Sequence, residues 1–231
     1  MIGRIFSITA LIGALVFTTL AAPAPYSLFG DSQLVSPGNN SPTAAKLVSG
    51  PVTGFGGIDF NVTPGLTFAD YTKLSTDYFV SAGNCGAGSP RFQFQVVNPE
   101  TNEQSTIDVY FMNVNFGQSC TTGQWVNSGD LTSIGYADNI PLAGNTYVPY
   151  ATAQNTYGSY EVIGIQLVVD SGYSSAEGQT FKFDNVMINN STFTFESANS
   201  CKNGGFMQFA SAPGPFANQG QCVSYFARGG Q

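Results

Sequence analysis

From Gly57 onward the chain consists of short runs in which apolar and polar residues alternate, separated by stretches rich in Gly, Asn, Ser and Pro. Side chains of a β-strand point alternately to its two faces, so such runs predict strands with one face in a core. Many short strands joined by turn residues are typical of a sandwich. The candidate strands are Ile58–Val62, Thr72–Val80, Phe92–Val97, Ile107–Met112, Val162–Val169, Thr180–Ile188 and Thr192–Phe195. We therefore expect an all-β fold, an antiparallel jelly-roll-like β-sandwich.

Two of these runs, joined by the polar segment from Asn98 to Ser105, alternate most regularly. If they pair antiparallel, their large apolar side chains share one face of a sheet and their polar side chains share the other. The polar face would then carry Arg91, Gln93, Gln95, Asp108 and Tyr110.

Departures from a simple one-faced strand pattern are predicted at four further places. The run Val162–Val169 has apolar residues of both parities, which favours a central strand buried on both faces. In Thr180–Ile188 the apolar residues switch parity after Phe183, and a β-bulge at Asp184 and Asn185 would reconcile the two halves. Asn189 and Asn190 then predict a hairpin turn, because Asn tolerates positive φ. A short helical turn is expected only at Ala151–Thr156.

The chain divides into three parts. Residues 1–21 read as a secretory signal peptide, with Arg4 before an apolar run and small residues near Ala21. Residues 22–56 show no sustained period and are rich in Pro, Gly, Ser and Asn, so we expect a flexible N-terminal arm. Residues 57–231 are expected to form a single β-sandwich domain that ends in a disulfide-closed tail. The predicted location is secreted, extracellular or in the cell wall.

Four cysteines in an exported chain predict two disulfides. Of the three possible connectivities we expect the sequential one, Cys85 to Cys120 and Cys201 to Cys222, and each bond would contribute about 3 kcal/mol. Sequons for N-glycosylation begin at Asn39, Asn61, Asn189 and Asn190. Asn189 and Asn190 overlap, so we expect at most one of them to be used.

Composition excludes several kinds of function. The chain has no histidine, which excludes Ser-His-Asp and Cys-His nucleophilic sites and metal sites that depend on His. Its formal charge is −7, with seven basic residues against fourteen acidic ones, which disfavours nucleic acid and anionic membranes as partners. No later segment is long and apolar enough to predict membrane insertion. The remaining catalytic option is a pair of carboxylates that hydrolyses polysaccharide, although no specific motif for it is present.

The polar face is the best candidate for a ligand surface. Amides, carboxylates and Arg form paired hydrogen bonds with vicinal hydroxyls, and Tyr110 could stack on a sugar ring. The competing interpretation is an ordinary solvated sheet face. Trp125, the only tryptophan, is predicted to pack near the first disulfide rather than to stack on a ligand.

Asp184 and Asp170 are candidates for binding a structural calcium ion, because each lies at a strand end or bulge where oxygen ligands can converge. The segment Phe183-Asp-Asn-Val-Met-Ile188 resembles the terminal strand of carbohydrate-binding jelly-roll modules, in which such an Asp helps to bind calcium. The alternative is an Asp that accepts backbone hydrogen bonds at a bulge.

Four segments resemble a family of exported bacterial and fungal proteins: Gly88-Ser-Pro-Arg-Phe-Gln93, Cys120 to Leu131, Phe183-Asp-Asn-Val, and the tail beginning Cys201-Lys-Asn-Gly-Gly-Phe206. That tail usually reads Cys-Lys-x-Gly-Gly-Trp, and here Phe206 replaces Trp. The resemblance implies a secreted β-sandwich and no particular activity. We expect a non-catalytic protein that binds polysaccharide or a cell-wall glycan, with a polysaccharide-active enzyme and a structural or host-interaction protein as the alternatives.

Overall fold

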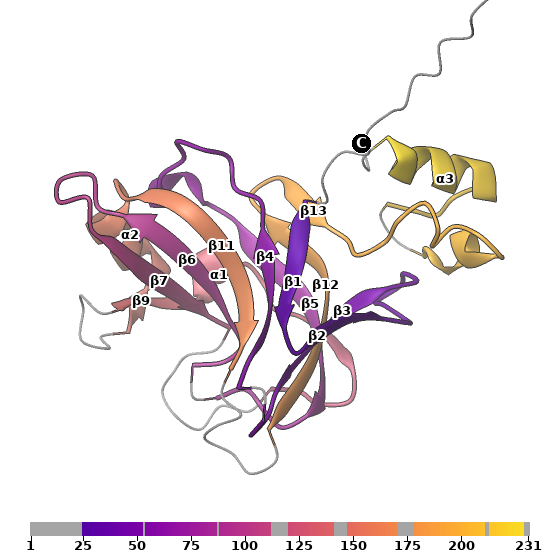
Figure 1. Ribbon diagram of the computed structural model, residues 1–231, viewed down its shortest axis with the longest axis horizontal. Helices are drawn as coiled ribbons and strands as arrows, with labels where there is room; N and C mark the ends of the chain where they lie inside the picture. Colours follow the sequence, from indigo (N-terminus) through magenta and orange to yellow (C-terminus); the bar gives the residue numbers. More distant parts are fainter. Residues whose placement is uncertain are drawn as a thin grey trace, which may run out of the picture.

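The computed structural model describes residues 25–52, 54–86, 88–111, 120–140, 147–170, 178–210 and 213–228. Two antiparallel sheets face each other in this part of the chain, as Figure 1 shows. This arrangement confirms the predicted all-β sandwich, and the chain forms two disulfides, Cys85–Cys120 and Cys201–Cys222, in the predicted pairing. The predicted signal peptide, residues 1–21, and Met112 lie outside the described residues.

Sheet A has seven strands and sheet B has six. In spatial order, sheet A contains β1 (Tyr26–Gly30), β4 (Gly56–Phe60), β11 (Glu161–Val169), β6 (Arg91–Val97), β7 (Gln104–Tyr110), β9 (Tyr136–Ile140) and β10 (Val148–Pro149). Sheet B contains β2 (Ser32–Val35), β3 (Ala44–Ser49), β12 (Gln179–Ile188), β5 (Leu74–Ala82) and β8 (Trp125–Asn127), and β13 (Ser191–Phe193) also pairs with β12.

The core lies between the sheets and follows the predicted alternation. The antiparallel pairing of β6 with β7 is confirmed, with Phe92 opposite Val109 and Phe94 opposite Ile107. All four side chains are fully buried, as are Phe181 and Phe183 from the facing strand β12. The β11 strand is interior, paired with β4 and β6, as expected. A bulge between Val162 and Gly164 leaves Ile163 41% exposed, so β11 is not buried along its whole length.

Short helices pack against the same core. The 3-10 helix η1 (Phe68–Asp70) and helix α2 (Tyr150–Tyr157) contribute the buried rings of Phe68 and Tyr150, whose centroids are 5.2 Å apart. Helix α2 contains the helical turn predicted at Ala151–Thr156. Helix α1 (Leu131–Ile134) is capped by Asp130, whose side chain accepts a hydrogen bond from the backbone N–H of Thr132. None of the helices in the described residues is long and apolar enough to cross a membrane.

The prediction of a flexible arm over residues 22–56 is wrong for residues 26–49, which form β1, β2 and β3. Ala44, Ala45 and Leu47 are fully buried, and β3 pairs with β12 while β1 pairs with β4. These strands are short and lack regular alternation, so their own sequence does not predict them, and pairing with neighbouring strands stabilises them. The sandwich therefore begins well before Gly57.

The predicted irregularity of β12 is confirmed. Its register against β5 shifts between Asp184 and Met187, and Asn185 has φ of 49°. Asn189, with φ of 53°, forms the predicted hairpin turn into β13.

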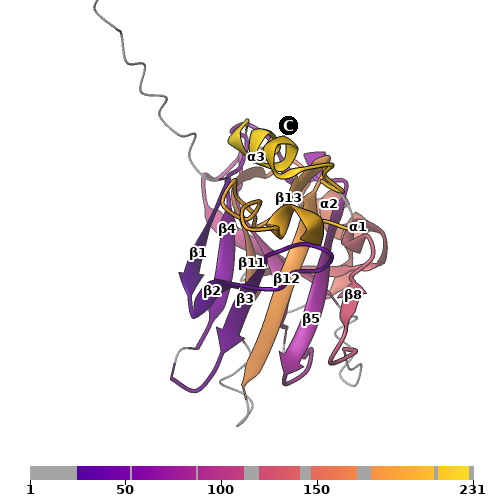
Figure 2. The ribbon, with the colours of Figure 1, turned by 90° about the vertical axis from the view of Figure 1, so that its right-hand side faces the viewer.

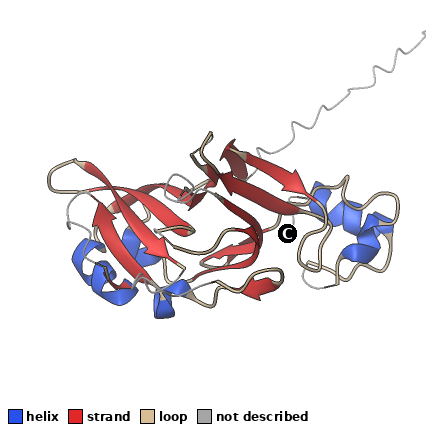
Figure 3. Ribbon diagram, turned by 90° about the horizontal axis from the view of Figure 1, so that it is seen from below, coloured by secondary structure: helices blue, strands red, loops and turns tan. Residues whose placement is uncertain are grey.

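The C-terminal tail is closed by a disulfide, as predicted, and forms a small helical unit. The predicted Cys201–Cys222 disulfide joins the region of η3 (Gly205–Gln208) to helix α3 (Gln219–Ala227). Phe209 and Phe216 pack with the two cysteines in a core of their own. Figures 1 and 3 show this unit beside the sandwich. Its helices were not predicted because both are too short to show a helical period.

Candidate functional site

The predicted ligand residues do share the outer face of sheet A. In the register of β6 and β7, Arg91 lies opposite Tyr110 and Gln93 lies opposite Asp108, while Gln95 lies opposite Thr106. The structure thus brings all five together, as the alternation predicts. Their environments divide them into two groups, because Arg91, Asp108 and Tyr110 are engaged inside the protein.

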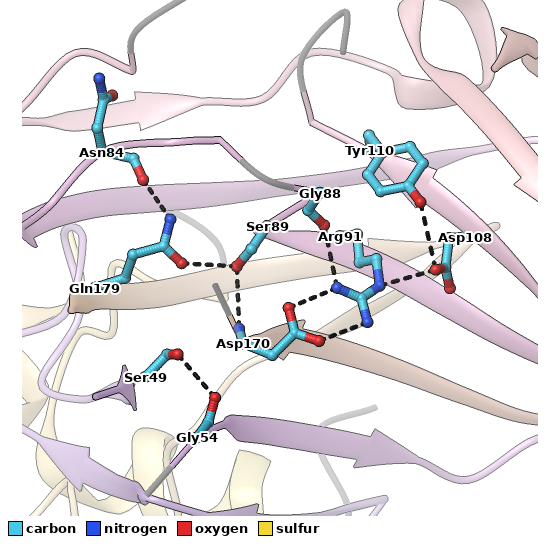
Figure 4. Close-up of polar contacts among 10 residues, drawn as sticks. All are labelled: Ser49, Gly54, Asn84, Gly88, Ser89, Arg91, Asp108, Tyr110, Asp170 and Gln179. Atoms are coloured by element: carbon cyan, nitrogen blue, oxygen red, sulfur yellow. Dashed lines mark hydrogen bonds and ion pairs between the residues drawn. The ribbon is translucent and has the colours of Figure 1, made fainter. Parts of the chain in front are cut away.

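Arg91 is held between two carboxylates, as Figure 4 shows. Its two terminal nitrogens donate to the two oxygens of Asp170, each at 2.7 Å, and its Nε lies 3.1 Å from Oδ2 of Asp108. One terminal nitrogen also donates to the carbonyl of Gly88 at 3.1 Å. Burial alone would lower the pKa of Arg91, but the hydrogen bond with Asp170 and the charges of Asp108 and Asp170 outweigh it and raise the pKa. The guanidinium is a fixed cation in an internal network.

The same network connects the two sheets. The backbone N–H of Asp170 donates to Oγ of Ser89 at 3.1 Å, and Ser89 donates to Oε1 of Gln179 at 2.8 Å. Gln179 begins β12 in sheet B, and its amide donates to the carbonyl of Asn84. The side chain of Asn84 accepts from the backbone N–H groups of Cys85 and Cys120. The segment Gly88-Ser-Pro-Arg-Phe-Gln93 therefore supplies the centre of a brace between the sheets, next to the first disulfide.

Asp108 and Tyr110 belong to this brace rather than to an open surface. Asp108 is 2% exposed and Tyr110 is 4% exposed, and the Tyr110 hydroxyl lies 3.4 Å from Oδ2 of Asp108. The expectation that Arg91, Asp108 and Tyr110 form a ligand surface is corrected, because the sequence period gives the face on which a side chain lies but not its long-range partners.

Gln93 and Gln95 remain partly exposed, and the structure adds two residues to them. Gln166 of β11 lies directly opposite Gln93, and Asp59 of β4 lies directly opposite Gln166. Gln95 lies directly opposite Gly164 of β11, and its side chain covers that glycine, because a Cβ on Gly164 would be 2.7 Å from Oε1 of Gln95. We call Asp59, Gln166, Gln93 and Gln95 the amide row. The Gln166 and Asp59 positions were missed because pairing between distant strands is not visible in the sequence.

The two carboxylates predicted to bind calcium lie in different sheets. Asp170 follows β11 of sheet A and is paired with a guanidinium, which occupies the position a cation would need. Asp170 therefore does not fit a calcium ion. The part of the chain that the structure describes contains no group of three Cys, Asp or Glu side chains that could hold a metal ion.

Asp184 lies at the bulge in β12 and is fully buried. Its Oδ2 accepts from the backbone N–H of Asn39 at 2.8 Å and from the Ser41 hydroxyl at 2.7 Å, while Oδ1 accepts from the backbone N–H of Asn185 at 2.8 Å. N–H groups aimed at both oxygens repel a cation, so this arrangement does not fit a calcium ion either. It matches the alternative of an Asp that accepts backbone hydrogen bonds at a bulge.

These bonds fasten the segment of residues 36–43, which we call the strap. The strap connects β2 to β3, and Figure 2 shows it crossing in front of β12. Beyond β12, the side-chain amide of Asn39 donates to Asp77 of β5 at 2.9 Å, and Asn185 and Asn127 donate to the same carboxylate at 2.8 and 2.7 Å. Burial is the main reason that the pKa of Asp184 rises to about 7, and the nearby charge of Glu196 adds to it. Burial also raises the pKa of Glu196.

Asp184 and Glu196 both have raised pKa values, and a polysaccharide-cleaving enzyme needs two carboxyl groups of which at least one has a raised pKa. Asp184 has no exposed surface, however, and the strap lies over it. A polysaccharide chain cannot reach Asp184, so these two carboxylates do not act together as a glycosidase site.

The outer face of sheet B carries an aromatic pair that the sequence interpretation missed. Trp125 packs against Phe79, with ring centroids 5.7 Å apart and planes at 63°, and its predicted proximity to the first disulfide stays a prediction. The two residues are directly opposite in β8 and β5, and both are partly exposed. Phe79 shares its parity with Ser75 and Asp77, which is the signal that could have placed it on the solvent side.

The four sequons differ in their surroundings. The side-chain amides of Asn39 and Asn189 form intramolecular hydrogen bonds, donating to the Asp77 carboxylate and to the carbonyl of Asp70, respectively. Asn61 and Asn190 are exposed. Glycosylation therefore remains a prediction, with Asn61 and Asn190 the more accessible acceptors.

The fold and these surfaces define the class: an all-β sandwich with two disulfides. No protein-family model matches the chain, and no curated protein matches it. Among solved structures, an exo-beta-agarase is similar over 75% of this chain and 24% of that chain, with 11% identity and a TM-score of 0.33. The chain thus spans 24% of that protein's length, and a similarity of this size carries no functional assignment.

Proposed function

We propose that this protein is an exported, non-catalytic glycan-binding protein and that the amide row on sheet A is its binding surface. The observation that carries the proposal is the direct juxtaposition of Asp59, Gln166 and Gln93 on three adjacent strands, with Gln95 beside them. Each Gln amide offers both a donor and an acceptor, and a carboxylate accepts only. Adjacent groups of this kind match neighbouring sugar hydroxyls, which donate and accept together.

An aromatic surface borders the amide row. The ring of Phe29 in β1 lies over Gly57, and a Cβ on Gly57 would collide with that ring. The ring of Phe55, which is 49% exposed, has its centroid 6.1 Å from the centroid of the Phe29 ring. Gly57 is two residues from Asp59 along β4, so the rings and the row belong to the same outer face. Aromatic rings provide the apolar half of sugar recognition, since a pyranose has an apolar face as well as its hydroxyls.

The predicted cellular location supports the same proposal. Two disulfides favour an oxidising compartment, and free glycan chains are abundant outside cells. The signal peptide predicted at residues 1–21 would direct the protein there.

The test is retention on a panel of insoluble and immobilised polysaccharides, followed by affinity measurement on any that retain the protein. Gln93→Ala with Gln166→Ala should weaken binding about tenfold or more, because each lost hydrogen bond contributes about 1 kcal/mol. Gln208→Ala, at an exposed glutamine of the C-terminal unit, is the matched control and should bind as the wild type does. Failure of the wild type to bind any polysaccharide would overturn the proposal.

A further inference from the structure

A single row of side chains crosses the outer face of sheet B from β3 to β8. Its members, each directly opposite the next across the strands, are Lys46, Lys182, Phe79 and Trp125. All four side chains are partly exposed. Neighbouring strands are about 4.8 Å apart, so the row extends about 14 Å. We call it the lysine-aromatic row.

The aromatic end of this row is not part of the hydrophobic core. Neither Phe79 nor Trp125 belongs to the buried clusters or to the partly buried side chains that pack against them. The two large rings rest on each other instead, on the solvent side of the sheet. A pair of surface rings with no role in the core is a surface suited to stacking on a ligand.

The other end carries two like charges side by side. Lys46 lies directly opposite Lys182, and Nζ of Lys182 is 5.1 Å from the centre of the Phe79 ring. Like charges directly opposite each other destabilise a sheet. Both ion pairs observed in the described part of the chain belong to Arg91, so neither lysine is neutralised by a carboxylate there. The chain has only seven basic residues and a net charge of −7, yet two of them meet at this position.

We infer that the lysine-aromatic row binds an anionic polysaccharide built of uronate residues. The indole of Trp125 would take the apolar face of a pyranose, and the two ammonium groups would take a carboxylate from a neighbouring sugar. A carboxylate placed there relieves the repulsion between Lys46 and Lys182, which gives the binding energy a definite source. The acidic remainder of the molecule argues against nucleic acid and anionic membranes, whose binding needs many more cations.

This row belongs to sheet B, whereas the amide row belongs to sheet A, so the two surfaces can be tested separately. The experiment measures binding of polygalacturonate to the full chain by calorimetry at low ionic strength. Lys46→Gln with Lys182→Gln should weaken binding at least tenfold, and so should Trp125→Ala. Fully methyl-esterified polygalacturonate, which keeps the sugar backbone and loses the charge, should bind the wild type as weakly as charged polymer binds the lysine variant.

Two controls make the outcome decisive. Lys73→Gln with Lys202→Gln removes two exposed lysines elsewhere and should leave affinity unchanged. The Lys46 and Lys182 variant should unfold at the same temperature as the wild type or above it, because a repulsion is removed. Equal affinity for the esterified polymer, equal affinity of the lysine variant, or no binding would overturn the inference. Binding of single-stranded DNA or anionic vesicles lost in the same variant would overturn it too.

Discussion

At the scale of single residues, Arg91 shows what a sequence can and cannot reveal about a site. The alternation of β6 correctly places Arg91 on the polar face with Gln93 and Gln95. Its partner Asp170 is 79 residues further along the chain, and no local pattern connects the two. The sequence therefore predicts the face, while the change from ligand surface to brace depends on a contact that only the fold creates.

The contribution of the brace to the stability of the folded protein can be tested at Arg91. Arg91→Ala should lower the free energy of unfolding by about 3 to 5 kcal/mol, because it leaves Asp108 buried without its cation. Urea unfolding measures this change. Lys73→Ala, at an exposed lysine, should have an effect below about 0.5 kcal/mol. A similar small effect for Arg91→Ala would show that the network does not hold the sheets together.

The raised pKa of Asp184 predicts how the stability of the folded protein depends on pH. An Asp in an unfolded chain has a pKa of about 4, whereas burial raises the pKa of Asp184 to about 7 in the folded protein. Between these values the folded state binds a proton that the unfolded state does not, so stability falls as pH rises from about 4 to about 7. Below about pH 4 both states are protonated, and above about pH 7 the contribution of Asp184 is constant. The raised pKa of Glu196 acts in the same direction.

The Asp184→Asn variant isolates this contribution because its side chain does not titrate. Relative to the variant, the wild type should lose stability between about pH 4 and about pH 7 by about 2 to 4 kcal/mol. Thermal unfolding of both proteins across this range provides the measurement. If the difference between them does not change with pH, Asp184 is ionised in the folded protein throughout.

At the scale of elements, the strands that were predicted and those that were missed differ in one physical respect. The runs that became β6, β7 and β12 have large apolar residues at alternating positions, so their own pattern indicates which side chains are buried. The β1, β2 and β3 strands show no comparable alternation, and they are placed by pairing, β1 with β4, β2 with β3 and β3 with β12. The bulge in β12 was predictable because a bulge shifts the period within a single run.

The strap is an element whose fit depends on one glycine. A Cβ at Gly38 would collide with Oγ of Ser41 and the carbonyl of Thr43, and would lie 2.6 Å from Oδ2 of Asp184. Gly38→Ala should therefore displace the strap, expose the Asp184 carboxyl and cost about 2 to 3 kcal/mol. Gly50→Ala is the matched control, because a Cβ at Gly50 meets nothing within 4 Å. Equal stability of the two variants, measured by chemical unfolding, would show that the strap is loosely held.

At the scale of the whole molecule, the described residues contain two cores of very different size. The large core lies between the sheets, and a second one in the C-terminal unit consists of Cys201, Phe209, Phe216 and Cys222. The cysteine count predicted both disulfides but not this separation, because helices as short as η3 and α3 leave no period in the sequence. The two parts are connected near the strap, where the backbone N–H of Ala210 donates to the carbonyl of Asn40.

A core of four buried residues is too small to hold a chain segment folded without a covalent staple. Replacing both Cys201 and Cys222 with Ser should therefore unfold the C-terminal unit and leave the sandwich intact. Hydrogen exchange should show fast exchange within α3 and unchanged protection of β6 and β12. Replacing Cys85 and Cys120 instead should lower the unfolding temperature of the sandwich, since both cysteines belong to the large core and their disulfide contributes about 3 kcal/mol. Loss of protection in β12 in the first variant would mean that the two cores fold as one, and the sandwich would then depend on the C-terminal unit for its stability.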